Sequence, residues 1–202
     1  PTRFQGVCLH HDLGPLGTAV NRRATERQLE IMQDMGVNAI RTSHNPPSPE
    51  QVRLCDEMGL MIQIEAFDMW EKPKVENGYS KFFNEWHKQD LRDMIRAFRN
   101  SPSVVMWSIG NEILEQSDKI NGERIANELA MICKQEDPTR PTTAGFNYYP
   151  APIKNGLASA IDLVGWNYKP RKYAEITERH PNWVIYGSET SSTVSSRGVY
   201  HL

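Results

Sequence analysis

The sequence contains few cysteines, no excess of basic charge and no long apolar run. Each of these absences excludes a class of protein. Its three cysteines, Cys8, Cys55 and Cys133, are far apart and without C-x-x-C spacing, which indicates buried thiols and neither a disulfide framework nor a zinc site. A formal net charge of −2 offers no basic field to nucleic acid. No apolar run approaches the roughly 18 residues of a membrane span. Neither nucleic acid nor a membrane is therefore an expected partner.

The sequence also lacks the short motifs of several other chemistries. G-x-G-x-x-G and G-x-x-x-x-G-K, which hold phosphates in nucleotide-binding folds, do not occur. H-E-x-x-H is absent, and the adjacent His10, His11 and Asp12 would point to alternate faces of a strand and could not converge on one ion. G-x-S-x-G is absent too, and Ser188 has no adjacent base. No catalytic metal and no nucleophilic serine are therefore expected.

What is present is a repeated alternation of a short apolar run and a longer helical stretch. Several runs are apolar at successive positions, as is typical of strands in a parallel sheet that is covered on both faces. Seven runs fit this description, at residues 4–9, 37–41, 60–64, 103–108, 141–144, 161–166 and 183–187. No repeat, low-complexity tract or linker interrupts them, so residues 1–202 are interpreted as one domain.

Residues with known helix-capping preferences separate these runs. Ser48 before Pro49 is suited to begin a helix, and Gly59 is suited to end it. Ser80 is expected to cap a longer helix that continues to about residue 98. Further helices are expected over about residues 117–134 and, as shorter segments, after Pro150 and Pro170.

This alternation leaves two architectures. A doubly wound sheet has about six strands and a glycine-rich turn after the first, and this sequence has neither feature. A TIM barrel has eight strands and about 250 residues. The sequence therefore predicts an α/β protein, a (β/α)8 TIM barrel that is truncated before its eighth strand, with a doubly wound nucleotide-binding domain as the alternative.

Acidic, imidazole, amide and aromatic side chains follow nearly every run, at the strand ends where barrels carry their active sites. Glu112 and Glu189 follow the fourth and seventh runs, 77 positions apart, and in an eight-stranded ring these ends face each other. Hydrolysis of a glycosidic bond needs a neutral carboxyl group to protonate the leaving oxygen and an ionised one as nucleophile or base. The two glutamates are therefore expected to converge on one sugar ring, with about 5 Å between their carboxyl groups.

Each of these residues also has a purely structural interpretation. A glutamate after a strand is often an exposed loop acid or a charge at a helix start, and His44 precedes an Asn-Pro-Pro sequence that is typical of a turn. Trp166 and Tyr168 would then pack at the rim, and Arg41 would serve only as the counter-ion of Glu65. The presence of both carboxylates favours catalysis over the remaining alternative, a non-catalytic carbohydrate-binding barrel.

Four segments resemble the catalytic barrel of glycoside hydrolase family 2, which contains β-galactosidases, β-glucuronidases and β-mannosidases. They are G-V-C-L-H-H-D at residues 6–12, N-A-I-R-T-S-H-N-P at 38–46, S-P-S-V-V-M-W-S-I-G-N-E at 101–112 and G-S-E at 187–189. The similarity extends in order over nearly the whole chain. Residues 14–24, 66–70 and 191–198 are most similar to bacterial multidomain β-galactosidases.

The resemblance implies a retaining exo-β-glycosidase whose carbohydrate substrate is a β-galactoside, with β-glucuronidase or β-mannosidase activity as the alternatives. Glu112 matches the acid/base, and Glu189 matches the nucleophile of a double displacement through a covalent glycosyl-enzyme. The other matched residues are Asn111 at the sugar 2-hydroxyl, Tyr168 beside the nucleophile, His10 and His44 along the sugar subsite, and Arg41 as a brace for the nucleophile with Glu65 in support. Trp166, at the end of the sixth run, is expected to bind the sugar as well.

Some features of the family are not expected in this chain. The loop after residue 65 lacks the E-x-H that holds magnesium in some members, so no metal and no other cofactor is expected. The eighth strand, the residues that select the sugar and the β-sandwich domains of the family are expected outside this chain, in the same polypeptide. The sequence leaves open whether the protein forms a homo-oligomer, and whether it works in the cytoplasm or, after export, in the periplasm or the medium.

Overall fold

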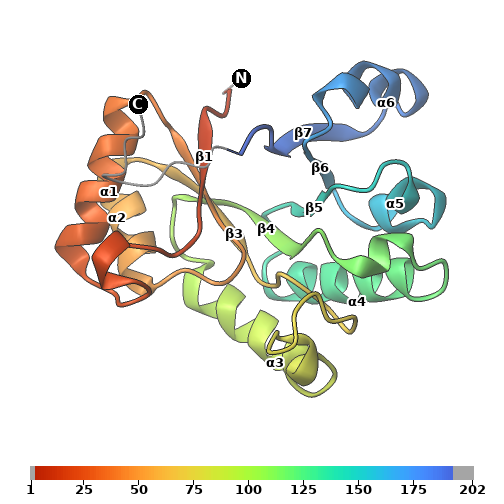
Figure 1. Ribbon diagram of the computed structural model, residues 1–202, viewed down its shortest axis with the longest axis horizontal. Coiled ribbons are helices and arrows are strands. Elements are labelled where there is room, and N and C mark those ends of the chain that lie inside the picture. The colour runs from red at the N-terminus through yellow and green to blue at the C-terminus, as the bar shows by residue number, and fades with distance from the viewer. Residues whose placement is uncertain (1–2, 193–202) are drawn as a thin grey trace, which may run out of the picture.

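A computed structural model describes residues 3–192, which form one curled sheet with helices on its outer side (Figure 1). Its strands are β1 (Gly6–Leu9), β2 (Ala39–Thr42), β3 (Met61–Glu65), β4 (Val104–Asn111), β5 (Thr142–Phe146), β6 (Leu163–Asn167) and β7 (Val184–Glu189). Every neighbouring pair is parallel, and the strands follow one another in sequence order. This order is that of a TIM barrel and excludes the doubly wound alternative, in which the strand order reverses. The described residues supply seven of the barrel's eight strands.

Helices connect successive strands. The α-helices are α1 (Arg22–Asp34), α2 (Pro49–Met58), α3 (Ser80–Phe98), α4 (Asn121–Glu136), α5 (Ala151–Lys154) and α6 (Tyr173–Arg179). Short 3-10 helices are η1 (Gly14–Leu16), η2 (Leu114–Ser117), η3 (Leu157–Ala160) and η4 (Pro170–Lys172). Within the described part of the chain, no helix has both the length and the apolar character needed to cross a membrane.

The seven predicted strands are all present, but two helix starts differ from prediction. Ser48 caps α2 as predicted, and Gly59 ends it in a left-handed conformation with φ 73°. Ser80 is not a cap, because the preceding turn already supplies acceptors, with the N–H of Phe82 donating to the carbonyl of Tyr79 at 2.8 Å. The helix predicted from about residue 117 begins only at residue 121, since the carboxylate of Asp118 accepts the backbone N–H groups that open its first turn.

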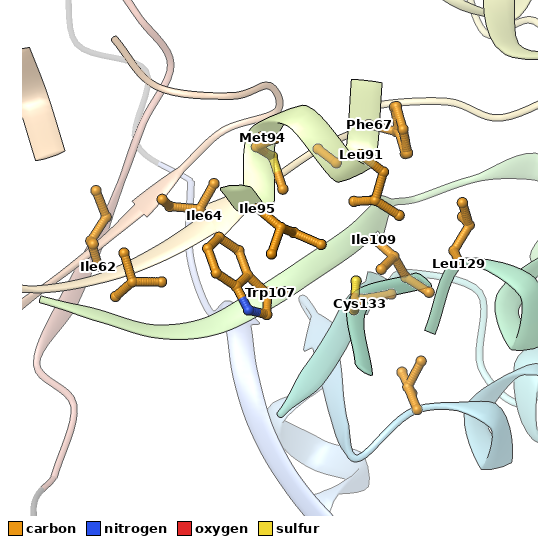
Figure 2. Packing of buried hydrophobic residues seen from close by; sticks show 14 of the residues in the cluster. Ile62, Ile64, Phe67, Leu91, Met94, Ile95, Trp107, Ile109, Leu129 and Cys133 are labelled. Carbon is orange, nitrogen blue, oxygen red and sulfur yellow. The ribbon is translucent and has the colours of Figure 1, made fainter. Parts of the chain in front are cut away.

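The outward-facing side chains of the strands form the hydrophobic core with the helices. Ile62 and Ile64 of β3 and Trp107 of β4 have no exposed surface and lie against α3 and α4 (Figure 2). The helices contribute Leu91, Met94, Ile95, Leu129 and Cys133 to the same cluster. Each fully buried aliphatic side chain of this kind contributes about 1.5–3 kcal/mol. This layer fixes which face of each strand points into the barrel.

The inward face of the sheet is polar. The hydroxyl of Tyr186 in β7 donates to Gln63 Oε1 of β3 at 3.0 Å and lies 3.0 Å from the hydroxyl of Thr143 in β5. Burial raises the pKa of Tyr186 to about 12, so this hydroxyl keeps its proton. Hydrogen-bonded side chains of three strands therefore lie inside the barrel beneath the strand ends.

A second polar network holds the opposite end of β4. The guanidinium of Arg140 donates to Asp137 at 2.7 Å and to the carbonyls of Val104, Arg99 and Ser101, and the indole of Trp107 donates to Asp137 at 3.0 Å. Burial alone would raise the pKa of Asp137, but these and neighbouring hydrogen bonds outweigh it and lower the pKa to about 2. The stabilisation that Asp137 provides is therefore present above its ordinary pKa near 3.8 and is lost as the pH falls toward 2.

We expect Arg140→Met to lower the free energy of unfolding by about 2–4 kcal/mol at pH 7, because it removes the cation paired with the buried Asp137 carboxylate and leaves three carbonyls without their donor. Urea unfolding measures the loss, which should shrink as the pH is lowered through the range in which Asp137 titrates. Arg96→Met is the matched control, since the Arg96 side chain is exposed and its partner Glu136 keeps Arg92 and Arg99. Equal effects of the two substitutions would contradict the importance of the Arg140 network.

Candidate active site

The strand ends bring together the residues that the sequence singled out. Arg41 of β2, Glu65 of β3, Asn111 of β4 and Glu189 of β7 lie within one hydrogen-bonded cluster, although up to 148 positions separate them in the sequence. All neighbouring strands are parallel, so their carboxyl ends meet at one end of the sheet. Glu112 directly follows this cluster at the end of β4.

Two strand irregularities turn site residues inward. In β4, Ser108 pairs with Thr143 and Asn111 pairs with Gly145, so three steps on one strand match two on the other. In β7, Gly187 pairs with Trp166 and Glu189 pairs with Asn167, so Ser188 is an extra residue. Regular alternation would have placed Asn111 and Glu189 on the outer face with the core. Bulges of this kind re-aim side chains, and here they direct both residues into the barrel.

Arg41 is the centre of the cluster. Its guanidinium donates to Glu65 Oε2 at 2.7 Å, to Glu189 Oε1 at 2.6 Å and to Asn111 Oδ1 at 2.9 Å, and its side chain is only 5% exposed. Burial would raise the pKa of Glu65, but the charge of Arg41 and a hydrogen bond from His44 outweigh it and hold the pKa below its usual value. Glu65 is thus an ionised, fully buried counter-ion, as the structural interpretation of the sequence expected, and it also helps to hold Arg41 at Glu189.

Glu189 is held as an anion. Burial acts to raise its pKa, but hydrogen bonds from the Tyr168 phenol and from Arg41 prevail and lower it. The same contact, together with burial, raises the pKa of Tyr168 to about 12, so the phenol remains a donor. A carboxylate that is ionised, partly desolvated and fixed by two donors has the properties of a nucleophile or a base.

Asn167 joins the two candidate catalytic carboxylates. Its side-chain nitrogen lies 2.9 Å from Glu112 Oε1 and 3.0 Å from Glu189 Oε1. One atom contacts both oxygens, so these oxygens lie within about 6 Å of each other, in accord with the expected separation of about 5 Å. The Asn167 side-chain oxygen accepts the hydroxyl of Ser188 at 2.6 Å, which fixes the orientation of the amide. Asn167 was not among the predicted site residues, although it follows Trp166 directly.

The backbone is strained at two of these positions. Glu112 has φ 43° and Tyr168 has φ 58°, in the left-handed region that side chains other than glycine seldom adopt. Such strain costs on the order of 1–3 kcal/mol per residue and occurs mainly where a fold over-determines a functional position. Both residues direct side chains toward Glu189 or Asn167. The orientation of these two side chains therefore lowers the stability of the fold.

The cluster needs space that a glycine provides. A Cβ atom on Gly145 of β5 would lie 3.0 Å from Asn167 Oδ1, 3.1 Å from Arg41 Nη2 and 3.2 Å from Asn111 Oδ1. Every one of these three atoms belongs to the hydrogen-bonded network of the site. Gly145 thus leaves room on the inner wall for the side chains of three other strands.

His44 and His10 lie on the β1–β2 side of the cluster. His44 Nδ1 is 2.7 Å from Glu65 Oε1, and its Nε2 is 3.7 Å from Glu189 Oε1. The His10 ring meets the His44 ring edge-on, with 5.0 Å between the ring centroids. Although His10 keeps an exposed surface, the burial of part of its ring and the neighbouring His44 lower its pKa. A cavity of about 460 Å³ opens beside His44 and Asp68, with Phe67 and Tyr79 among its walls. Its lining includes neither Glu112 nor Glu189, so the cavity adjoins the cluster only at His44 and Asp68.

Trp166 is not at the site, and its prediction as a sugar-binding residue is wrong. The side chain has no exposed surface and packs among Phe146 and Tyr149 on the outer face of β6. Its neighbours in the strand, Gly165 and Asn167, take the inward positions. Alternation along the strand decides the orientation, and it sends the residue between them outward.

No group of three or more His, Cys, Asp or Glu side chains is placed to hold a metal ion among residues 3–192. The carboxylate of Asp68, which follows β3, instead accepts the ammonium of Lys74 at 2.6 Å.

Two carboxylates lie close together at the carboxyl ends of β4 and β7, and a cation and a phenol fix one of them. This arrangement is typical of barrels that hydrolyse glycosides. Residues 1–183 match the family described as glycosyl hydrolases family 2, TIM barrel domain. The chain belongs to glycoside hydrolase family 2.

Relatives and solved structures agree with this assignment. A β-galactosidase of Bacteroides ovatus is 41% identical over 100% of this chain, and a β-glucuronidase of Bacteroides fragilis is 36% identical over 98% of it. A crystal structure of a family 2 member from Bacteroides cellulosilyticus has a TM-score of 0.86 at 40% identity over 92% of this chain. The chain spans 27% and 29% of the two relatives and 24% of the crystallised protein, so these proteins have further parts.

We expect Arg41→Met to cost about 3–5 kcal/mol of stability at pH 7, because it leaves Glu65 ionised and buried without a cation. The deficit should shrink as the pH falls, since protonation of Glu65 relieves the variant while the wild type loses stabilisation below the ordinary carboxyl pKa near 4.5. Thermal unfolding between pH 7 and pH 4 measures this trend. The double variant Arg41→Met/Glu65→Gln removes both charges and should recover much of the loss; a double variant as unstable as the single one would contradict the ion-pair explanation.

Proposed function

We propose that the protein is a retaining exo-β-glycosidase that hydrolyses terminal β-galactosides. The observation that supports this most strongly is the joint contact of Asn167 with Glu112 and Glu189, because retaining enzymes need a carboxyl separation of about 5–5.5 Å and inverting ones about 6.5–9.5 Å. The unequal surroundings of the two carboxylates support a division of roles, with Glu189 as nucleophile and Glu112 as acid/base.

In the first step, a Glu189 carboxylate oxygen attacks the anomeric carbon and forms a covalent glycosyl-enzyme. The bond from that carbon to the leaving oxygen breaks, and the proton of Glu112 passes to this oxygen. The hydrogen bonds from Arg41 and Tyr168 keep Glu189 ionised before the attack. They also orient its oxygens, which limits the conformational freedom lost on reaching the transition state.

In the second step, Glu112 accepts a proton from a water molecule, and the water oxygen attacks the anomeric carbon. The bond to Glu189 breaks, the sugar leaves with its original configuration, and Glu112 is protonated again for the next cycle. Two inversions at one carbon give net retention. Asn167, which contacts both carboxylates, keeps their distance constant through both steps.

The sugar is held by the residues around these carboxylates. The side-chain oxygen of Asn111 accepts hydrogen bonds from Arg41 and Asn167. Its side-chain nitrogen makes only a long contact of 3.4 Å to Asp68. That nitrogen is therefore available to donate to the 2-hydroxyl group in the transition state, which adds several kcal/mol in such enzymes. His10 and His44 supply ring nitrogens to the remaining hydroxyl groups.

The preference for a galactoside rests on the B. ovatus relative, which is 41% identical over the whole of this chain. β-Glucuronidase activity is the second candidate because the B. fragilis relative bears that name. A panel of aryl β-galactoside, β-glucuronide and β-mannoside substrates, tested on the full-length gene product, separates these activities.

Glu189→Ala should lower kcat/KM on aryl β-glycosides by about 10⁴-fold or more, because no nucleophile remains. Added azide should then restore turnover and give a glycosyl azide of inverted configuration, since azide attacks once from the side of Glu189. Glu112→Ala is the paired control, in which azide intercepts the glycosyl-enzyme and gives the retained configuration. NMR of the azide products decides the assignment, and the opposite pattern would refute it.

Tyr168→Phe should move the acidic limb of the kcat/KM profile to higher pH. The substitution removes a hydrogen bond that favours the ionised form of Glu189, so the pKa of Glu189 rises and activity is lost at a higher pH than in the wild type. Tyr148→Phe serves as the control, because Tyr148 is exposed on the loop after β5. An acidic limb that does not move in Tyr168→Phe would show that the phenol does not set the charge state of Glu189.

A further inference from the structure

The irregular segment between β3 and α3, residues 66–79, places a lysine beside the acid/base. The Lys74 ammonium donates to Asp68 Oδ1 at 2.6 Å and to the Asp68 carbonyl at 3.0 Å. It also donates to the backbone carbonyl of Asn111 at 3.2 Å. The Lys74 side chain is 22% exposed, so these contacts are partly shielded from water.

The Asn111 carbonyl belongs to the peptide group that joins Asn111 to Glu112. The N–H of the same peptide group, on Glu112, donates to the carbonyl of Gly145 at 2.8 Å. Lys74 therefore holds this peptide plane from one side and β5 holds it from the other. The plane leads directly into the left-handed φ of 43° at Glu112.

A left-handed glutamate needs such a restraint. Rotation of the preceding peptide would let Glu112 relax toward an ordinary φ and would carry its carboxyl group away from Asn167. A charged donor is well suited to oppose this rotation, since hydrogen bonds to charged groups are about twice as strong as neutral ones. Asp68 keeps the ammonium in place and at the same time accepts the Asn111 side chain.

We propose that Lys74 is a positioning residue for proton transfer by Glu112, which rests on the function proposed above. Lys74 does not touch the sugar; it fixes the peptide that aims the acid. Its loss should therefore weaken the delivery of a proton to the leaving oxygen while leaving the nucleophile on β7 intact.

General damage to the fold would lower activity on all substrates alike, whereas misplacement of the acid would depend on the leaving group. A sugar or alkyl leaving group departs as an alcohol and needs the proton of Glu112, whereas a 2,4-dinitrophenyl group departs as a stable anion without it. General acid catalysis contributes about 10²–10⁴-fold to such reactions, so misplacing the acid should remove a part of that factor for poor leaving groups only. The parameter kcat/KM reports this first step for both substrates.

The experiment compares Lys74→Met and Lys74→Arg with the wild type on the methyl and 2,4-dinitrophenyl β-glycosides of the preferred sugar. We expect Lys74→Met to lower kcat/KM about 10–100-fold on the methyl glycoside and less than about 3-fold on the dinitrophenyl glycoside. Lys74→Arg should restore at least part of the loss, because it keeps a charged donor. Lys72→Met is the matched control in the same segment, since Lys72 pairs with Asp118 and should show no leaving-group dependence.

Equal losses of Lys74→Met on both substrates, or no loss on either, would overturn the proposal. Glu112→Gln separates this failure from that of the proposed function. If Glu112→Gln lacks the leaving-group dependence, the acid assignment itself is wrong. If Glu112→Gln shows the dependence and Lys74→Met does not, only the role of Lys74 is refuted. Where Lys74→Met does not fold, Lys74→Gln, which removes the charged donor and keeps a polar side chain, provides the same comparison.

Discussion

The site depends on the buried guanidinium of Arg41. A single planar group with donors in fixed directions satisfies Glu65, Glu189 and Asn111 from three other strands, and a lysine could not hold three such acceptors at once. The single positive charge of Arg41 faces two carboxylates, so these ion pairs leave one negative charge over. That charge is tolerable because other donors, among them the Tyr168 phenol, complete the hydrogen bonds of the carboxylates. The ionised state of Glu189 thus follows from a network and not from solvent.

A regular sheet could not present these groups. The inward face of a strand recurs at every second residue, and the irregularities before Asn111 and at Ser188 shift that phase where β4 and β7 end. Glycine at position 145 then keeps the inner wall free of a side chain that would collide with the cluster. Each device lowers the stability of the sheet locally, and the apolar layer between strands and helices offsets the cost.

The sequence was sufficient for the strands and for the residues at their ends, because apolar runs and the helix signals between them report the outer layer of the barrel. It was insufficient to predict which side chains point into the barrel and which point outward. Trp166 was predicted at the sugar and lies in the core, while Asn167, one position later, contacts both carboxylates. Counting alternate positions along β6 would have separated these two. Counting would have misplaced Asn111, because bulges have no clear signal in a single sequence. Lys74 had no signal either, since a lysine in a loop is usually solvated.

The division of labour between two chemically identical side chains can be argued from donors alone. Glu189 receives hydrogen bonds from a guanidinium, a phenol and an amide, all of which favour its anion. Glu112 receives one hydrogen bond among the described residues, from the Asn167 amide, and no cation contacts its carboxyl group there. Lys74, which contacts the peptide group before Glu112, makes its hydrogen bonds to Asp68 and to the backbone. A site that places a cation and a phenol on one carboxyl group and not on the other favours ionisation of the first. This asymmetry supports the same assignment as the family resemblance, and it does so from geometry that the resemblance did not supply.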